Sequence, residues 1–276
     1  MTTVENLSLD EERALYGSKS ITVRSCRFDG IADGESALKE SRGVTVTDTF
    51  FNLRYPLWHV KGACVYKSEM TEMCRAPIWY SSDIRLENCI INGTKALREC
   101  NGIKVKDCAV SSNEFGWSIS DVLVEGSSFS GEYFMLRASN LRFVNSTLNG
   151  KYSFQYVENA VFENCTLNTK DAFWHAKNVT LRSCTVNGEY LGWYSENLTL
   201  EGCIIEGTQP LCYCKGLKML DCKMKGADLS FEKSEVDVDL TEPIISIKNP
   251  KSGKIRVPSY DELIMDNAGN VEIITK

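Results

Sequence analysis

The adjacent stretches NAVFENCTLNTKDAFWHAK (159–177) and NVTLRSCTVNGEYLGWYSE (178–196) decide the fold, because they align residue for residue over 19 positions. The same unit repeats without a gap up to residue 234, in units that begin at 83, 102, 121, 140, 159, 178, 197 and 216. Units beginning at 20, 43 and 62 precede this run, of which the first and third are longer than 19 residues, and another unit begins at 235. Repetition at a fixed period of this length is the signature of a solenoid or a related repeat architecture.

The columns of the repeat predict β-strands. Positions 2, 4 and 9 of each unit are apolar, as in Val179, Leu181 and Val186, and position 3 between the first two is mostly polar. Such alternation is typical of a strand with one buried face. Position 1 is mostly Asn, Gly or Asp, residues that tolerate the positive φ of a turn. A unit this short cannot bury its own apolar face, so the units must stack as coils.

We therefore predict an all-β fold, a right-handed parallel β-helix of about 12 coils with a 19-residue period. Right-handed winding is favoured because a left-handed β-helix usually has a hexapeptide period, and 19 is not a multiple of six. The chain is expected to form a single domain, 1–276, with coils over 20–235.

The ends of a β-helix need caps, because their strands are open edges. The N-terminal cap is expected at 1–19, where SLDEERALYG (8–17) predicts a short helix with Ser8 as N-cap. The C-terminal cap is expected at 236–276. There, IISIKNPKSGKIRVPS (244–259) and DELIMDNAGNVEIITK (261–276) predict two closing hairpins.

The charge distribution excludes several partners. The net charge is −6, and acidic and basic residues are interspersed along the chain. A nucleic-acid or anionic-membrane surface would need a basic stripe, so neither partner is expected. No apolar run approaches the length that a membrane-spanning helix needs, so no span is expected. The polar, acidic start lacks the apolar region of a secretory signal, and a cytoplasmic location is the expectation.

Seven of the twelve cysteines share position 7 of the repeat. They are Cys26, Cys89, Cys108, Cys165, Cys184, Cys203 and Cys222. In other coils the position holds Thr49, Ser68, Ser127 and Ser146. Since Cys, Ser and Thr are close in size, we interpret the column as small inward side chains rather than a thiol ladder for metal or redox chemistry. The lone Cys212-x-Cys214 pair is a weak metal motif. No metal and no cofactor are expected.

Positions 16 and 17 form two aromatic columns that contain all five tryptophans and both histidines. Position 16 holds Trp58, Trp79, Arg98, Trp117, Leu136, Gln155, Trp174, Trp193, Cys212 and Phe231. Position 17 holds His59, Tyr80, Glu99, Ser118, Arg137, Tyr156, His175, Tyr194, Tyr213 and Glu232. Positions 12 and 13 add a charged rim of Lys95, Glu114, Glu132, Lys151, Asp171, Glu189 and Asp228.

Adjacent residues of a strand face opposite ways. We therefore expect the more apolar position 16 to point inward and position 17 to point outward. Arg98 is expected between Trp79 and Trp117 in a cation–π sandwich, because an unpaired buried guanidinium would be costly.

The outer column suggests a binding groove, because mixed residue types suit a site better than a simple stack. Aromatic faces with carboxylates and guanidinium groups are suited to sugars, so the expected ligand is carbohydrate-like. The expected ligand-binding residues are His59, Trp58, Trp79, Tyr80, Arg98, Trp117, Gln155, Tyr156, Asp171, Trp174, Glu189, Trp193, Tyr194 and Tyr213.

Whether the protein is an enzyme stays open at this point. The catalytic candidates are His175 and Glu99, with Arg137 as the base of a lyase. A hydrolase would instead use a pair of carboxylates. For Tyr and His the simpler interpretation is cross-coil stacking. The alternative function is a non-catalytic structural or protein-interaction module, with a homo-oligomer as one form.

Several segments also resemble a bacterial family, domain of unknown function 3737, within the pectin-lyase-like right-handed β-helix group. They are DGESALKE (33–40), LRYPLWH (53–59), KALREC (95–100), GKYSFQYVEN (150–159), TKDAFWH (169–175), GEYLGWYSENL (188–198) and GTQPLCYC (207–214). The resemblance covers nearly the whole chain and implies the fold and its handedness. It implies no reaction, because the family has no established catalytic residues. The wider group contains pectate lyases and polygalacturonases, but their calcium-binding and paired aspartates have no counterpart in this sequence.

Overall fold

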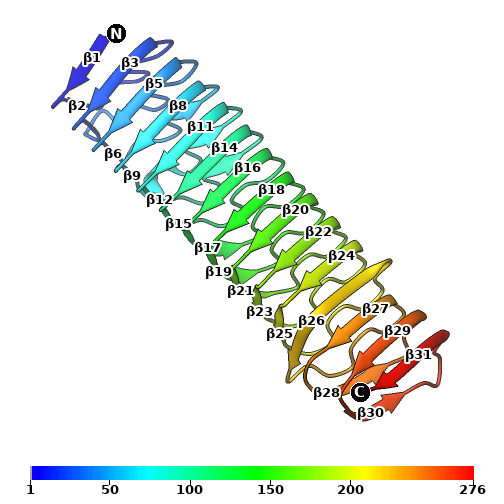
Figure 1. The fold of residues 1–276 in the computed structure, drawn as a ribbon. Coiled ribbons are helices and arrows are strands. Elements are labelled where there is room, and N and C mark those ends of the chain that lie inside the picture. Colours follow the sequence, from blue (N-terminus) through cyan, green and yellow to red (C-terminus); the bar gives the residue numbers. More distant parts are fainter. Residues whose placement is uncertain (1) are drawn as a thin grey trace. The chain divides into compact units, whose positions relative to one another are not determined.

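The computed structural model describes residues 2–276 and contains strands and turns throughout (Figure 1). Within that range the one helical segment is the 3-10 turn η1 (Glu72–Cys74). The chain divides into two compact units, Met1–Ser139 and Asn140–Lys276, which are described separately below. Each unit is a parallel β-solenoid with a period of about 19 residues, and the chain contains about 14 turns.

Unit 1 has three strand-bearing sides, and on each side the strand of one coil pairs in parallel with that of the next. The first side consists of β1 (Thr2–Glu5), β3 (Lys19–Arg24), β5 (Arg42–Thr47), β8 (Lys61–Tyr66), β11 (Ser82–Glu87), β14 (Asn101–Lys106) and β16 (Ser120–Glu125). The second consists of β2 (Ser8–Leu9), β4 (Arg27–Phe28), β6 (Phe50–Phe51), β9 (Glu69–Met70), β12 (Ile90–Asn92), β15 (Ala109–Ser111) and β17 (Ser128–Glu132). The third consists of β7 (Leu57–Trp58), β10 (Ile78–Trp79) and β13 (Leu97–Arg98).

Unit 2 follows the same plan, again with parallel pairing (Figure 1). Its first side consists of β18 (Ser139–Val144), β20 (Glu158–Glu163), β22 (Lys177–Arg182), β24 (Glu196–Glu201), β26 (Leu217–Lys225), β27 (Glu235–Leu240), β29 (Ser252–Val257) and β31 (Asn270–Thr275). Its second consists of β19 (Thr147–Lys151), β21 (Thr166–Lys170), β23 (Thr185–Asn187) and β25 (Ile204–Glu206). The strands β28 (Ile244–Lys248) and β30 (Tyr260–Ile264) form a further pair.

The predicted 19-residue register is confirmed inside both units. In unit 1, Ile84 pairs with Ile103, and in unit 2, Val179 pairs with Leu198. The predicted inward columns are the core: Val179, Leu181 and Val186 are buried, as are their equivalents in other coils. Each coil therefore buries its apolar side chains against the same residue positions of the coils above and below it.

The position-7 column is buried, as expected, and its hydrogen bonds explain why Cys, Ser and Thr interchange. Cys108 donates its Sγ–H to the carbonyl of Lys106 at 3.2 Å, and Ser127 donates its Oγ–H to the carbonyl of Glu125 at 2.9 Å. The backbone N–H of Cys108 in turn donates to Ser127 Oγ at 3.1 Å. The position thus needs a small side chain that both donates and accepts.

The two cysteines of the Cys212-x-Cys214 pair are also buried and structural. Cys214 Sγ and Ser195 Oγ form a hydrogen bond at 3.3 Å, and the N–H of Cys214 donates to Ser234 Oγ at 2.8 Å. Burial raises the pKa of Cys212 to about 12 and that of Cys214 to about 11. Among residues 2–276, no three His, Cys, Asp or Glu side chains are grouped as metal ligands would be.

The expected N-terminal capping helix is wrong. Residues 2–17 form a further coil, in which β1 pairs with β3 and β2 pairs with β4, both in parallel. The segment predicted to be a helix sends its N–H groups to the next coil instead, since Arg13, Leu15 and Gly17 donate to the carbonyls of Glu35, Ala37 and Lys39. Inter-coil pairing here satisfies the backbone groups that a helix would have bonded within itself.

The two closing hairpins at the C-terminus are also wrong, because a hairpin needs antiparallel strands. Instead, β27 pairs with β29 and β29 pairs with β31, all in parallel. The solenoid continues with shorter coils, as the pairing of Glu235 with Ser252 shows. These coils could not be predicted by repeat alignment, because they lack the regular period. Together with the N-terminal coil they explain why the chain has about 14 turns and not the predicted number of about 12. No helix in the described range has the length and apolarity to cross a bilayer.

Candidate functional site

Positions 16 and 17 both face outward, so the expectation that they point to opposite sides is wrong. The reason is the backbone of position 17, which adopts the left-handed conformation in coil after coil, with φ of 55° at His59, 54° at His175 and 60° at Tyr194. Alternation of side chains holds only for extended backbone. The five tryptophans are consequently half-buried, whereas Cys212 and Phe231 of the same column are in the core.

In unit 1, position 16 forms one continuous stack. The rings of Trp58 and Trp79 are parallel, with centroids 5.2 Å apart. The guanidinium of Arg98 lies 5.2 Å from the ring centroid of Trp79 and 4.9 Å from that of Trp117. The predicted cation–π sandwich is confirmed. Arg98 is also 3.9 Å from Glu99 and 4.0 Å from Glu114, so its charge is compensated on the outer side.

Each indole is fixed by the same hydrogen bond. Trp58 Nε1–H donates to the carbonyl of Ala76 at 2.6 Å, and Trp174 Nε1–H donates to that of Tyr190 at 2.7 Å. The acceptor is always the position-13 carbonyl of the next coil. Gln155 replaces a tryptophan by the same means, since its Nε2 donates to the carbonyl of Asp171 at 3.3 Å.

Position 17 forms exposed ring stacks in each unit. In unit 1, His59 and Tyr80 stack at 5.1 Å. In unit 2, His175 stacks on Tyr156 at 4.9 Å and on Tyr194 at 5.0 Å, and Tyr194 stacks on Tyr213 at 4.8 Å. The simple stacking interpretation therefore holds for these residues. Both faces of His175 and of Tyr194 are covered, so a sugar cannot pack on them face to face.

Elsewhere in unit 2, Trp174 and Trp193 stack at 5.5 Å, and Glu189 pairs with Lys170 at 3.1 Å. Asp171 is only 5% exposed. Burial raises the pKa of its carboxyl group, Lys170 lowers it and Glu189 raises it further. A carboxyl group with a raised pKa is better suited to acid catalysis than an ordinary aspartate.

The three catalytic candidates do not form one constellation on the observed contacts. Glu99 is exposed and touches Arg98. Arg137 is exposed two coils further along position 17, with Ser118 in the coil between, so the Cα atoms of Glu99 and Arg137 are about 10 Å apart at the usual strand spacing. His175 belongs to unit 2 and lies between two tyrosine rings. Their catalytic roles stay predictions.

A cavity of about 410 Å³ opens beside the tryptophan stack of unit 1, and we call it the aromatic cavity. It is lined by Tyr55, Trp58, Arg75, Ala76, Trp79, Thr94 and Lys95. Its cause is Ala76, which occupies position 13 between Tyr55 and Lys95 of the neighbouring coils. In unit 2 a tyrosine at this position, Tyr190, packs edge-on against Trp193 at 5.4 Å. Tyr55 packs against Trp58 in a comparable way, with ring centroids 4.6 Å apart, so the small alanine leaves the corresponding space beside Trp79 empty.

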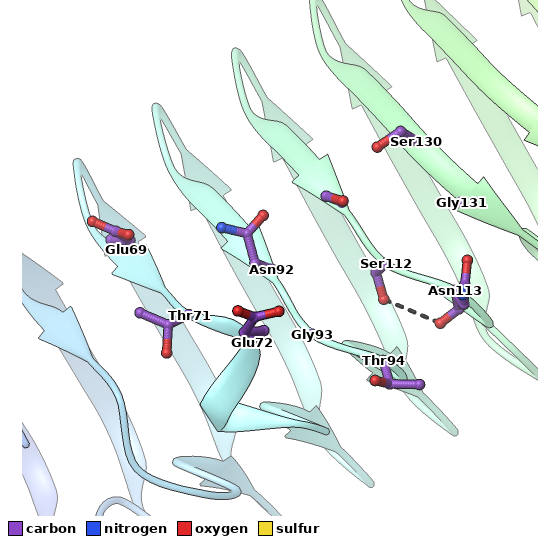
Figure 2. A pocket seen from close by; sticks show the side chains of 11 residues that line it. Glu69, Thr71, Glu72, Asn92, Gly93, Thr94, Ser112, Asn113, Ser130 and Gly131 are labelled. Carbon is purple, nitrogen blue, oxygen red and sulfur yellow. Dashed lines mark hydrogen bonds between the residues drawn. The ribbon is translucent and has the colours of Figure 1, made fainter.

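A second hollow, the polar cavity, has a volume of about 580 Å³ and lies on the second side of unit 1 (Figure 2). Its lining is Glu69, Thr71, Glu72, Asn92, Gly93, Thr94, Ser111, Ser112, Asn113, Ser130 and Gly131. Thr94 lines both cavities, which are therefore neighbours.

Sequence reasoning found the tryptophans and missed most of the residues that shape these cavities. Of the lining residues, only Trp58, Trp79 and the rim residue Lys95 were singled out by the repeat. Tyr55, Arg75, Ala76 and the whole polar cavity were missed. The available signal was the break in pattern, which consists of a small residue at position 13 and an insertion in the unit beginning at 62.

The fold and the stacked surface columns define a class, the parallel β-solenoids whose coils display aromatic and charged side chains. Within that class, the chain belongs to the family described as "Protein of unknown function (DUF3737)", whose match extends over residues 2–274. No curated protein matches the sequence.

Solved β-helix structures are similar at low identity. A surface adhesin of Streptococcus pneumoniae, PfbA, has a TM-score of 0.41 and 13% identity, covering 75% of this chain and 69% of the adhesin. A tailspike protein mutant of E. coli bacteriophage HK620, in complex with a pentasaccharide, has a TM-score of 0.44 and 13% identity, covering 92% of this chain. The match spans 62% of the tailspike chain, less than two thirds of its length.

The A-module of the mannuronan C-5 epimerase AlgE4 of Azotobacter vinelandii has a TM-score of 0.31 and 10% identity, covering 99% of this chain and 86% of the module. At these values none of the three similarities bears on the function of this chain.

Proposed function

We propose that the protein binds carbohydrate and that the aromatic cavity of unit 1 takes an acidic sugar. The observation that carries the proposal is the gap at Ala76, which leaves the space beside Trp79 open between Tyr55 and Lys95. A volume of about 410 Å³ is within the range of small-molecule sites, which are mainly apolar with a few polar groups.

The electrostatics of the aromatic cavity favour a negative ligand. Because Trp58 and Trp79 stack face to face, they present ring edges to the cavity, and the edge is the positive part of the aromatic quadrupole. Arg75 lines the cavity and makes no ion pair with the described residues. Lys95 also lines the cavity, but its Nζ forms an ion pair with Glu114 at 3.2 Å. None of the described residues that line the cavity carries a carboxylate, so its chemistry is that of binding rather than glycoside hydrolysis.

Tryptophan fluorescence tests the proposal directly. A trimer of galacturonic acid should change the emission on titration, and the neutral galactose trimer of the same linkage should bind at least about tenfold more weakly, since one charge-assisted hydrogen bond is lost. Ala76→Tyr should abolish uronate binding, because tyrosine would fill the gap as it does at position 190. Arg75→Met should weaken it.

The matched control is Lys104→Met, which removes one exposed cation from β14, away from the cavity. It should bind the uronate trimer as the unchanged protein does. The proposal fails if Ala76→Tyr, shown by circular dichroism to be folded, binds the uronate trimer with unchanged affinity.

A second candidate function, a glycoside hydrolase in unit 2, is favoured by Asp171. Its nearly buried carboxyl group has a raised pKa, and Glu189 of the next coil acts on it electrostatically. Glycoside hydrolysis requires two carboxyl groups, of which the general acid has a raised pKa. Release of reducing ends from an oligosaccharide panel, lost in Asp171→Asn, would support it. Single substitutions of His175, Glu99 and Arg137 test the candidates from the sequence, and unchanged turnover would exclude each.

A further inference from the structure

The polar cavity differs in chemistry from the aromatic cavity beside it. Among the described residues, its lining contains the carboxylates of Glu69 and Glu72 and no Lys or Arg. The remaining lining groups are hydroxyls, side-chain amides and glycine backbone. The two hollows therefore cannot favour the same ligand charge.

An insertion and two glycines form the polar cavity. The inserted residues of the unit at 62 fold into η1, which begins where Thr71 accepts a hydrogen bond from the N–H of Met73 at 3.2 Å. In Figure 2, η1 stands out beside Gly93 as one wall of the hollow. A Cβ at Gly93 would lie 2.8 Å from the carbonyl oxygen of Arg75, and one at Gly131 would lie 2.1 Å from that of Ser112. Both positions must therefore lack a side chain, which keeps the floor open.

The polar side chains of this cavity divide into two groups, since Thr71, Ser112 and Asn113 hydrogen-bond within the protein and others do not. Neither the Glu69 nor the Glu72 carboxylate makes a hydrogen bond or ion pair with the described residues. Lys67 and Glu69 both line a further hollow, but they form no ion pair there. The side-chain amide of Asn92 and the hydroxyl of Thr94 are equally uncommitted in that part of the chain. Figure 2 shows the Glu72 side chain beside η1, with Asn92 on the neighbouring strand. Donors and acceptors for a polyhydroxylated ligand thus surround two uncompensated negative charges.

We propose that the polar cavity is a second binding site, which takes a sugar that carries a free ammonium group. The ammonium would donate a charge-assisted hydrogen bond to Glu72, and such bonds are stronger than hydrogen bonds between neutral groups. The ring hydroxyls would exchange hydrogen bonds with Asn92, Thr94, Ser111 and Ser130. A metal ion fits less well, because two carboxylates with no third acidic, His or Cys ligand among residues 2–276 fall short of the usual cation site.

Calorimetric titration of the full chain tests the site. The β-1,4-linked glucosamine trimer should bind, and its N-acetylated counterpart, which lacks the ammonium, should bind at least about tenfold more weakly. Raising the ionic strength should weaken the binding of the glucosamine trimer, because salt screens the attraction between partly exposed charges. Glu72→Gln should reduce the affinity for the glucosamine trimer about tenfold.

The matched control is Glu125→Gln, which removes one exposed carboxylate from β16 and changes the net charge equally. It should bind like the unchanged protein, which separates a site from general attraction to a protein of charge −6. Equal affinity for the two trimers, equal loss in both variants, or full binding by Glu72→Gln would overturn the inference. Each probe is titrated alone, so uronate binding can fail while amino-sugar binding holds, and the reverse.

Discussion

Replacing Arg98 by alanine should destabilise the protein by about 2–3 kcal/mol. The guanidinium lies against two indoles at 5.2 and 4.9 Å, and its side chain is 27% exposed. A cation–π contact is worth about 0.5–1 kcal/mol at an exposed site and about 2 kcal/mol when desolvated, so two partly buried contacts give the stated range. The ion pairs to Glu99 and Glu114 are long and add at most about 0.5 kcal/mol.

Two further replacements separate stacking from charge. Arg98→Lys keeps the charge and loses the planar group, so about half of the stabilisation should remain. Arg98→Trp loses the charge and continues the ring stack, and aromatic pairs are worth about 0.5–1.5 kcal/mol each. Its stability should therefore stay within about 1 kcal/mol of the original.

Urea unfolding, followed by far-ultraviolet circular dichroism and by tryptophan fluorescence, measures these differences. The free energies are compared where the two signals give the same midpoint, because repeat proteins can unfold in stages. If Arg98→Ala stays within about 0.5 kcal/mol of the original protein, less than a single exposed cation–π contact, the reasoning is refuted. It is refuted equally if Arg98→Trp is less stable than Arg98→Ala.

Three other predictions follow from the core and the rim. Native protein should react with a thiol reagent at about one cysteine, Cys64, because Cys64 is half-buried and the other eleven are buried. In denaturant all twelve cysteines should react. More than two reactive thiols in the native protein would contradict this prediction. Cys108→Ser should change the free energy of unfolding by less than about 1 kcal/mol, whereas Cys108→Val should cost about 1–3 kcal/mol by removing the acceptor of the Cys89 N–H, and chemical denaturation distinguishes them. Asp171 has a folded-state pKa above its unfolded one, so its ionisation lowers stability as the pH rises through that value. Asp171→Asn should therefore be more stable than the original protein at neutral pH, with the advantage vanishing at acid pH in thermal unfolding; a constant difference at all pH values would argue against the linkage.

The sequence predicted the parts of the structure that repeat. The register, the inward columns and the Arg98 sandwich all follow from stacking residue i on residue i+19, and each is observed. The orientation of the aromatic columns was not predicted, because it depends on the left-handed backbone at residues such as His175. Tyr, His and Glu give no local sign of that conformation, unlike Asn or Gly.

The ends and the cavities were missed for a related reason. Residues 244–275 keep the coil but lose the 19-residue period, so hairpin signals were preferred there. Residues 2–9 keep the 19-residue register, with Thr2 paired to Ile21 and Ser8 to Arg27, but the local helix signal of 8–17 was preferred over it. The aromatic cavity arises from a residue that is smaller than its column neighbours, Ala76, and the polar cavity from the inserted η1 turn. A repeat alignment averages over such exceptions, although they are the places where the surface becomes concave.

The left-handed backbone at position 17 has a consequence for engineering. Asn and Gly are the residues best suited to that conformation, and the coils place Asn159 and Asn178 at position 1, where φ is 58° and 54°. Tyr, His and Arg at position 17 carry a conformational penalty of about 1 kcal/mol or more each. Backbone hydrogen bonds between coils maintain this conformation whatever side chain occupies position 17. Within either unit, position 17 can therefore be substituted to place chosen side chains on the surface at intervals of about 4.8 Å, one per coil.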